Sequence, residues 1–415
     1  MVLFMTPGLA FFYGGLVRVS SVVSMMMMSF GSIALVGTLW VVYGYAMSFG
    51  GAGGAGFVGF DGVFGIDTNK LFLADVFNAA KTGSGFDLVF AGFQGTFAII
   101  TVALISGAIA DRARFGSWMV FAALWATFAY FPIAGWVFNF TLDNGQITDG
   151  GWLVKDVGLL DFAGGTAVEV ASGAGALAIA IVVGKRFGFS KGMNVPHNVP
   201  LTLIGAGILW FGWFGFNAGS ALSAGSLAAT AMINTQIASA AAAMSWITFE
   251  KFRDGKATTL GVASGAIAGA VVITPACGYV NPIGALILGL IAGVASSYAV
   301  SRKYKFGYDD SLDVVGVHGV SGIVGMIGIG LFATATVNAT GKEGLFINGS
   351  PDLLIKQLIA IVAVAAFSFC ATWLIATVIT RTIGFRVPRD EELTGLDTTY
   401  HAESAYDITG NSNRY

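Results

Sequence analysis

Apolar runs alternate with short polar segments along almost the whole chain. Runs of about 17–25 residues are long enough to cross a bilayer as helices. The pattern predicts eleven such spans, bounded by polar residues, glycine or proline. They cover residues 1–17, 22–47, 87–110, 115–137, 162–184, 199–218, 226–250, 259–276, 281–301, 313–333 and 354–380. The chain is therefore predicted to be an all-α polytopic membrane protein.

The composition supports this fold class. Of the 415 residues, 55% are hydrophobic and only 11% are charged, whereas about 25% are charged in soluble domains. The 59 glycines suit close helix packing in lipid. A net charge of −2 with no basic tract gives no reason to expect a nucleic-acid partner, so the lipid bilayer is the expected environment.

Cysteine and glycine patterns point to no cofactor. Cys277 and Cys370 lie in or beside apolar runs, and we interpret both as buried thiols. The sequence shows neither a disulfide framework nor metal-ligand spacing. The glycine-rich run at residues 50–62 lacks a strand–turn–helix context, so we interpret it as an exterior loop and not as a phosphate-binding loop.

The first apolar run leaves two interpretations open. It is about 17 residues long, the lower limit for a span. The helix is either short or begins upstream of this sequence. No basic segment precedes the run, so a cleavable signal peptide is not expected.

The distribution of basic residues predicts the orientation. Sixteen of the 21 lysines and arginines fall on one side of the predicted spans, and short cytoplasmic loops carry the excess of such residues. This places the N-terminus outside and the C-terminus in the cytoplasm of a multi-pass plasma-membrane protein. Residues 1–380 form the transmembrane domain, and residues 381–415 form a cytoplasmic tail that is either a disordered end or a regulatory surface.

Eleven spans divide naturally into five, five and one. The two sets cover about residues 1–185 and 199–333, with an extra helix at about 354–380. Because five is odd, the second set must run in the opposite orientation to the first. Such inverted repeats are typical of transporters whose substrate site lies at the membrane midplane.

Two predicted helices carry ionisable residues at similar depths. Asp161 precedes Glu169 by eight residues, and Asp313 precedes His318 by five. At 1.5 Å per residue, Glu169 and His318 lie about 12 and 7.5 Å inside their helices, near mid-bilayer. Since the helices are the last of each repeat, we expect Glu169 and His318 to meet. We favour helix capping for both aspartates, and a proton pathway over a purely structural pair for Glu169 and His318.

Aromatic residues form a second group of candidates. Phe93 and Phe97 are one turn apart on the third predicted span, and Trp213, Phe216 and Ser220 lie at the outer end of the sixth. Aromatic faces attract cations that have lost water, and a hydroxyl oxygen can accept a hydrogen bond from an N–H group.

Several motifs in order resemble the ammonium transporter family (Amt/Mep/Rh). They are FYGGLVR, FQGTF, DFAGGT, VPHNVP, WFGFNAGS and GVHGVSG, followed by GFRVPRDEELTGLDTTYHAESAY in the tail. The resemblance implies an eleven-helix protomer, a homotrimer with one pore per subunit, and uptake of ammonium or ammonia, with methylammonium as a further substrate.

The resemblance also implies roles for the aromatic residues. Phe97 and Phe216 match the family's phenylalanine gate, while Phe93, Phe97 and Ser220 match its outer recruitment site. Where a recruitment tryptophan is common, alignment through YFPIAGWVF gives Phe138, with Trp136 as the alternative.

The polar pore residues follow in the same way. Asp161 matches an aspartate that orders the vestibule, with Asp313 in a corresponding supporting role, and Trp213 matches a pore-wall tryptophan. His318 matches the second pore histidine. Glu169 stands where the first pore histidine is usual.

Three other functions compete with ammonium transport. A Rh-like gas channel for ammonia or carbon dioxide and an ammonium sensor both use the same pore fold. An intramembrane enzyme is disfavoured, because the membrane residues supply neither a nucleophilic triad nor a metal site. A cytoplasmic PII-type regulator is a partner implied by family analogy alone.

Overall fold

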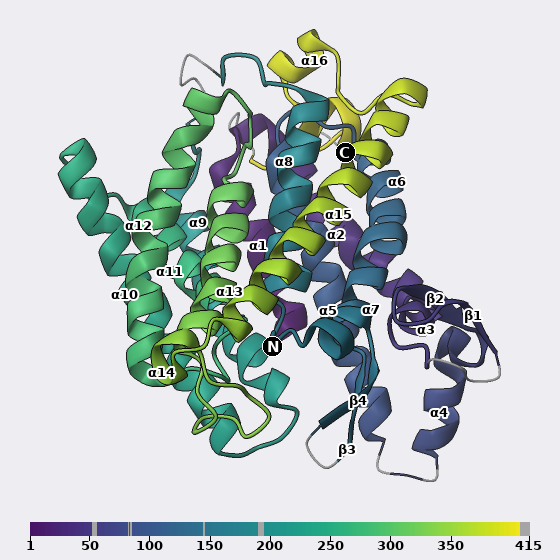
Figure 1. Cartoon of the computed structure of the whole chain (residues 1–415). Helices are drawn as coiled ribbons and strands as arrows, with labels where there is room; N and C mark the ends of the chain where they lie inside the picture. Colours follow the sequence, from purple (N-terminus) through teal and green to yellow (C-terminus); the bar gives the residue numbers. More distant parts are fainter. Residues whose placement is uncertain (52–55, 82, 84, 144–145, 190–194, 407–415) are drawn as a thin grey trace.

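The chain folds mainly into long apolar helices that run side by side (Figure 1). The structure is a computed structural model and describes residues 1–51, 56–81, 83, 85–143, 146–189 and 195–406. In this described part, nine helical segments are long and apolar enough to cross a membrane. They are Val19–Ser48, Phe86–Ile109, Phe115–Phe138, Gly165–Val183, Val199–Ala221, Ser226–Asp254, Pro282–Phe306, Val315–Phe332 and Asp352–Thr382.

Two further apolar helices, Val2–Leu16 and Thr259–Ile273, have 15 residues each. This is below the length of about 17 residues that a span normally needs. Each of the eleven predicted runs overlaps a helix, but the count of eleven membrane spans stays a prediction. The fold is a polytopic helical membrane fold.

The individual helices have these bounds: α1 (Val2–Leu16), α2 (Val22–Leu39), α3 (Tyr45–Ser48), α4 (Ala74–Ala80), α5 (Phe86–Ile105), α6 (Phe115–Trp125), α7 (Phe131–Phe138), α8 (Ala171–Val183), α9 (Val199–Asn217), α10 (Ser226–Asp254), α11 (Thr259–Ile273), α12 (Pro282–Phe306), α13 (Ser321–Phe332), α14 (Leu345–Asn348), α15 (Asp352–Thr382) and α16 (Arg389–Thr394). Short π-helical segments, η7 (Gly165–Val170) and η10 (Val315–Val320), lead into α8 and α13.

The prediction of an all-α protein is wrong in the loops. Strands β1 (Phe57–Phe60) and β2 (Phe64–Asp67) form one antiparallel hairpin, and β3 (Phe140–Asp143) and β4 (Gln146–Gly150) form another. Strand β1 lies within the glycine-rich run at residues 50–62 that we interpreted as an exterior loop, and β2 and α4 follow it. Residues 52–55 of that glycine-rich loop lie outside the described part of the chain.

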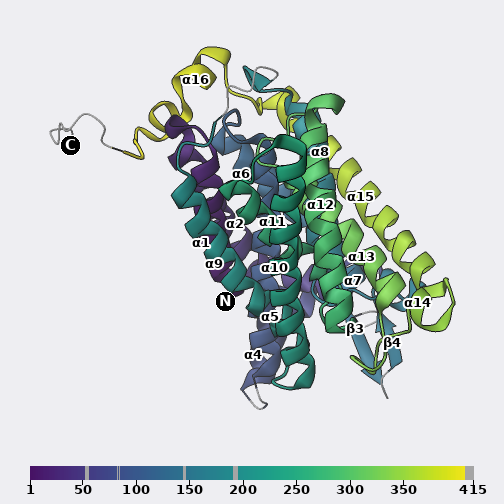
Figure 2. The same cartoon turned by 90° about the vertical axis from the view of Figure 1, so that its left-hand side faces the viewer.

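The two ends of the bundle differ. Strands β3 and β4 and helices α4 and α14 gather at one end, which we call the hairpin end, while α16 lies at the opposite, tail end (Figures 1 and 2). The helix α15 crosses the bundle obliquely in both views. Lys191 and residues 407–415, which we assigned to the tail side, lie outside the described residues.

Glycines allow the helices to approach closely. A Cβ atom on Gly8 of α1 would lie 2.7 Å from Cγ2 of Ile208 on α9. A Cβ atom on Gly205 of α9 would lie 2.2 Å from the backbone nitrogen of Phe12 on α1. These helices are the first of each predicted repeat. Helices in lipid associate through close van der Waals packing, and the small residues at this contact allow it.

The described part of the tail packs against the helix bundle. The carboxylate of Asp397 accepts hydrogen bonds from the backbone nitrogens of Val23 and Ser24 at 3.0 and 2.8 Å. Glu392 accepts one from the backbone nitrogen of Phe187 at 2.6 Å. The tail therefore covers the first turn of α2, whose own residue Ser21 supplies no side-chain cap.

Only one of the two cysteines is buried. Cys277 is fully buried, as predicted, but Cys370 is exposed on the surface of α15. An apolar run does not show which face of a helix points outward, and a helix at the edge of a membrane bundle exposes apolar residues to lipid.

Candidate functional site

Three cavities follow one another through the bundle. The largest, about 850 Å³, opens between the loops of the hairpin end, and we call it the outer vestibule. A small cavity of about 10 Å³ is lined by Phe216, Glu169 and His318. A third cavity of about 170 Å³, the inner cavity, is also lined by His318. His318 thus borders the small and the inner cavity, while the Phe97 ring separates the small cavity from the vestibule.

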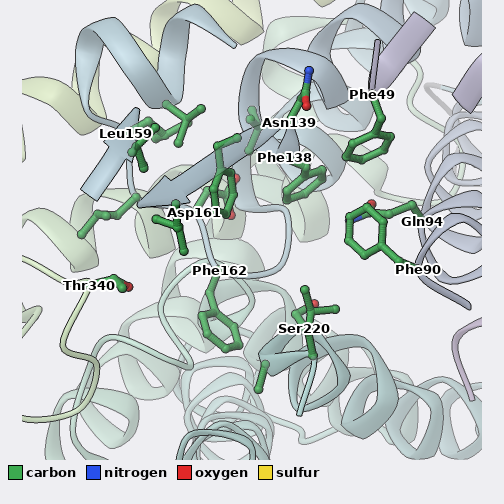
Figure 3. A pocket seen from close by; sticks show the side chains of 18 of the residues that line it. Phe49, Phe90, Gln94, Phe138, Asn139, Leu159, Asp161, Phe162, Ser220 and Thr340 are labelled. Atoms are coloured by element: carbon green, nitrogen blue, oxygen red, sulfur yellow. The ribbon is translucent and has the colours of Figure 1, made fainter. Parts of the chain in front are cut away.

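The outer vestibule has an aromatic wall. The rings of Phe93 and Phe97 are 4.8 Å apart and meet edge to face. Ser220 donates a hydrogen bond from its hydroxyl to the carbonyl of Phe216 at 2.7 Å, so its oxygen lone pairs remain available as acceptors. Figure 3 shows Ser220, Phe138 and Phe162 around this space. Aromatic faces and an acceptor oxygen are groups that bind a small cation with N–H donors.

Of the two predicted replacements for the recruitment tryptophan, only Phe138 lines the vestibule. Its ring lies 6.4 Å from that of Phe97. Trp136 lies elsewhere: it donates from its indole nitrogen to the carbonyl of Val63 at 2.5 Å and packs against Trp152.

Two phenylalanine rings close the route from the vestibule. The ring centroids of Phe97 and Phe216 are 4.3 Å apart, and each residue is only 1% exposed. Trp213 packs beside Phe216 and donates from its indole nitrogen to Thr274 at 2.8 Å. Because the two rings are in contact and buried, they must move before a molecule can pass between them. An ion would have to shed its water there.

Glycines bring the two ionisable residues together. A Cβ atom on Gly173 would lie 2.3 Å from the Cα atom of Gly319, and one on Gly322 would lie 2.8 Å from the Cβ atom of Glu169. Gly173 follows Glu169 by four residues, and Gly322 follows His318 by four. Each ionisable residue is therefore followed, one turn on, by a glycine that makes room for the other helix.

Both residues stand on π-helical segments, which interrupt regular helices and often mark functional sites. In the first segment, the carbonyl of Gly164 accepts from the backbone nitrogens of Val168 and Glu169, at 2.8 and 3.1 Å. Gly164 has φ +120°, a conformation that side chains rarely adopt. The local glycines thus set the direction of the Glu169 side chain.

The carboxylate of Glu169 contacts the His318 ring. Oε2 of Glu169 lies 2.7 Å from Nδ1 of His318, and the two residues are 0% and 4% exposed. The other oxygen, Oε1, is buried without a hydrogen-bond partner. The adjoining cavity of about 10 Å³ has the size of about one water molecule. The pair therefore offers one acceptor oxygen that no other group of the described residues uses, beside a small buried space.

Asp161 caps the helix that carries Glu169. Its carboxylate accepts from the backbone nitrogens of Gly164, Gly165 and Thr166 at 2.7–2.8 Å, and from the Thr166 hydroxyl at 2.6 Å. Four donors satisfy this carboxylate, although the residue also borders the outer vestibule. Its carboxylate therefore holds the start of the helix at the edge of the vestibule.

The prediction that Asp313 caps the second helix is wrong. Asp313 has φ +66° and pairs with Lys303, whose ammonium lies 2.5 Å from its carboxylate. The cap is Asp310, which accepts from the backbone nitrogen of Val315 at 2.7 Å. Asp310 precedes His318 by eight residues, the spacing that separates Asp161 from Glu169. This repeated spacing is the signal that was available and missed.

Other polar residues near the cavities were not predicted. Gln94 and Asn139 line the outer vestibule (Figure 3), and Lys303 lines the inner cavity. Gln94 belongs to the predicted span 87–110, which we examined only for aromatic residues, and Lys303 follows the predicted span 281–301, where we counted it only for charge bias. In the described part of the chain, no group of three or more histidine, cysteine or acidic residues has the geometry of a metal site.

Comparison with known proteins gives consistent matches over nearly the whole chain. The family model for the Ammonium Transporter Family matches residues 1–406. An ammonium transporter from Mycobacterium tuberculosis is 47% identical over 422 residues, covering 98% of this chain and 88% of that relative.

Solved structures agree with this match. Mep2 from Saccharomyces cerevisiae has a TM-score of 0.83 and 34% identity, covering 94% of this chain and 85% of that one. A structure titled Sensor Amt Protein has a TM-score of 0.85 and 28% identity, covering 96% and 95%. The family match, the relatives and the helical membrane fold together show that this chain belongs to the ammonium transporter family, whose members are channels and transporters and not enzymes.

Proposed function

We propose that the protein carries ammonium across a cell's plasma membrane through the route formed by the three cavities. The observation that carries this proposal is the position of the Glu169–His318 pair directly behind the contacting rings of Phe97 and Phe216. The proposed orientation has the hairpin end outside and the tail end in the cytoplasm, as the basic residues predict.

Recruitment begins in the outer vestibule. Phe93, Phe97 and Phe138 offer aromatic faces to a cation that has lost part of its water, and Ser220 accepts one of its N–H hydrogen bonds. Lysines also border the vestibule, among them Lys70, whose ammonium donates to the carbonyl of Phe49 at 2.5 Å. Shape and acceptor placement, and not overall negative charge, therefore attract the substrate.

Deprotonation follows at the pair. The free Oε1 atom of Glu169 accepts the proton of ammonium: one N–H bond breaks, an O–H bond forms, and neutral ammonia remains. The carboxyl group then turns to bring this proton to the side of His318, where the O–H bond breaks and an N–H bond forms at an unprotonated Nδ1. The His318 ring, which borders the inner cavity, releases the proton of its other nitrogen there. Ammonia regains a proton in the inner cavity.

This chemistry explains discrimination against potassium. Potassium is similar in size to ammonium but has no proton to give up. Moving any ion through a dry apolar constriction costs far more than moving a neutral molecule. Selectivity then arises at the pair directly behind the rings, because only a substrate that can give up a proton there continues as a neutral molecule.

We also propose that each subunit has eleven membrane spans and one pore, and that three subunits form a homotrimer. Membership of the ammonium transporter family supports both proposals. A second candidate function, ammonium sensing, is favoured by the similarity to the structure titled Sensor Amt Protein. The docked tail would then transmit the signal. A gas channel would need no free acceptor at the pair.

Currents recorded from proteoliposomes on a solid-supported membrane test the proposal. Ammonium pulses should give a current, methylammonium a smaller one and potassium none. A current of one charge per ammonia means that the proton follows the ammonia. Uptake of ammonia without current would favour the gas channel, and binding without flux would favour the sensor.

A further inference from the structure

A lysine ammonium lies in the wall of the inner cavity. Lys303, near the end of α12, lines this cavity together with Asp313 and His318. The route proposed for ammonium therefore passes the ammonium group of Lys303. This group resembles the substrate, because both are cationic nitrogens with several N–H donors.

The lysine is fixed by two oxygens. Its Nζ atom donates to the carbonyl of Asp310 at 2.8 Å and to the carboxylate of Asp313 at 2.5 Å. The side chain of Lys303 is 6% exposed, whereas that of Asp313 is 31% exposed. The carboxylate thus faces the cavity while its partner is held behind it. The positive φ of Asp313 directs the loop this way, a conformation that aspartate tolerates better than most residues.

The neighbouring charges are already committed. Asp309 forms an ion pair with Arg186 at 2.9 Å, and Arg112 lies 4.0 Å away. Burial raises the pKa of Asp309, but the hydrogen bonds and charge of Arg186 outweigh it and hold that pKa below the usual value. Arg186 also pairs with Asp111 at 3.2 Å. Arg186 and Arg112 are therefore paired with Asp309 and Asp111.

Asp310 and Asp313 depend on Lys303 instead. Asp310 uses one carboxylate oxygen to cap η10, and its other oxygen is buried without a hydrogen-bond partner. Lys303 is the basic side chain that contacts both residues. Removing its charge would leave the Asp313 carboxylate at the inner cavity without its ion-pair partner, and the Asp310 carbonyl without this donor.

We propose that Lys303 is a tethered counter-ion that occupies the place beside Asp313 where a departing ammonium or potassium ion would otherwise bind. A tethered group competes at an effective concentration in the millimolar range or above, which a free ion must exceed to displace it. The Asp313 carboxylate is therefore neutralised by Lys303 and does not retain the substrate in the inner cavity. This inference rests on the proposed transport function for its purpose, but the cation site that it predicts can be detected without transport.

Cation-dependent thermal unfolding of the purified protein provides the test. Lys303→Gln keeps a donor for the carbonyl of Asp310 and removes the charge. Ammonium or potassium chloride, compared with choline chloride at equal ionic strength, should raise the Tm of this variant by about 2 °C more than that of the wild type. The double variant Lys303→Gln/Asp313→Asn should lose this gain. Lys305→Gln, two residues further on and exposed, is the matched control.

Transport gives the second measurement. Potassium on the tail side should slow ammonium uptake by Lys303→Gln about five-fold and leave the wild type unaffected, with Lys303→Arg behaving as the wild type. Tail protection from added protease gives the orientation in the vesicles.

Two outcomes would overturn the inference. One is a folded Lys303→Gln variant with no cation-dependent gain, which would make the pair purely structural. The other is a gain that persists in the double variant, which would place the cation elsewhere. Lys303→Met, which keeps the aliphatic stem, replaces Lys303→Gln if that variant does not fold. An inactive wild type would contradict the transport function while leaving the unfolding result interpretable.

Discussion

One buried carboxylate oxygen, Oε1 of Glu169, makes the space behind the two phenylalanine rings different from a purely apolar constriction. Oε1 of Glu169 is buried and has no hydrogen-bond partner, and the residue borders a space of about one water molecule. Leaving such an atom unpaired is costly, so its persistence suits a site that the substrate completes. The contacting rings of Phe97 and Phe216 separate that site from the outer vestibule.

The sequence predicts these residues unequally well. Glu169 and His318 stand out because ionisable groups are rare inside apolar runs. Asp313 was assigned the wrong role because its backbone conformation, which turns it toward Lys303, leaves no trace in a hydrophobicity pattern. Lys303 itself was counted only as part of the basic surplus. Long-range ion pairs depend on how loops fold back, and spacing along the chain does not reveal this.

The gate gives the first prediction. Phe216→Ala removes one of the two contacting rings and should admit hydrated ions, so we expect the ratio of ammonium to potassium current to fall at least about ten-fold, equal to about 1.4 kcal/mol. A blocked pore would show instead that the ring is needed for passage. Leu203→Ala, on the exposed face of α9, is the control. Unchanged flux and selectivity would exclude a steric gate.

At the scale of helices, pairs of glycines decide which segments touch. Runs of apolar residues predicted a helix near each expected position because spans need a minimum length. Contacts between helices were harder to predict, since the 59 glycines gave no indication of which ones face a neighbour. The short hairpins β1–β2 and β3–β4 were missed because each strand has only four or five residues.

The second prediction concerns Gly173. Alanine there would place a Cβ atom 2.3 Å from the Cα atom of Gly319, which forces α8 and η10 apart. We expect the free energy of unfolding to fall by about 1–3 kcal/mol, together with a loss of transport because Glu169 and His318 separate. Thermal unfolding and current measurements on the same preparation check both effects.

Gly207→Ala is the matched control, because a Cβ atom on this glycine of α9 meets no other atom within 4 Å. Its unfolding should be unchanged or slightly more difficult, since alanine favours the helix. If Gly173→Ala and Gly207→Ala showed the same unfolding and the same current, the contact between Gly173 and Gly319 would not hold Glu169 and His318 together.

At the scale of the whole molecule, the tail and the bundle form one unit. Asp397 caps the start of α2, 374 residues earlier in the chain, and Arg18 donates to the carbonyl of Glu392 at 2.7 Å. The sequence left the tail open between a disordered end and a regulatory surface. The contacts of Asp397 and Glu392 with the bundle support an ordered surface at the tail end.

The third prediction tests this docking. Asp397→Ala removes two hydrogen bonds to the first turn of α2 and should cost about 1 kcal/mol of tail docking. Protease cleavage of the tail should become about five-fold faster, while the Tm of the bundle changes little. The exposed residue Glu403 provides the control variant, Glu403→Ala. Equal cleavage of the two variants would show that the tail is held by other contacts.

The most direct test of the whole account is the ammonium current of Glu169→Gln across a range of pH, recorded on a solid-supported membrane. Glutamine keeps the size of the side chain but cannot hold the proton. Because positioned proton transfer contributes about 10²–10⁴-fold to a rate, we expect the current to fall by at least about 100-fold. Glu169→His, which restores a titratable group, should retain a measurable current. A Glu169→Gln protein that carries ammonium at the wild-type rate and with the wild-type pH dependence would contradict the account.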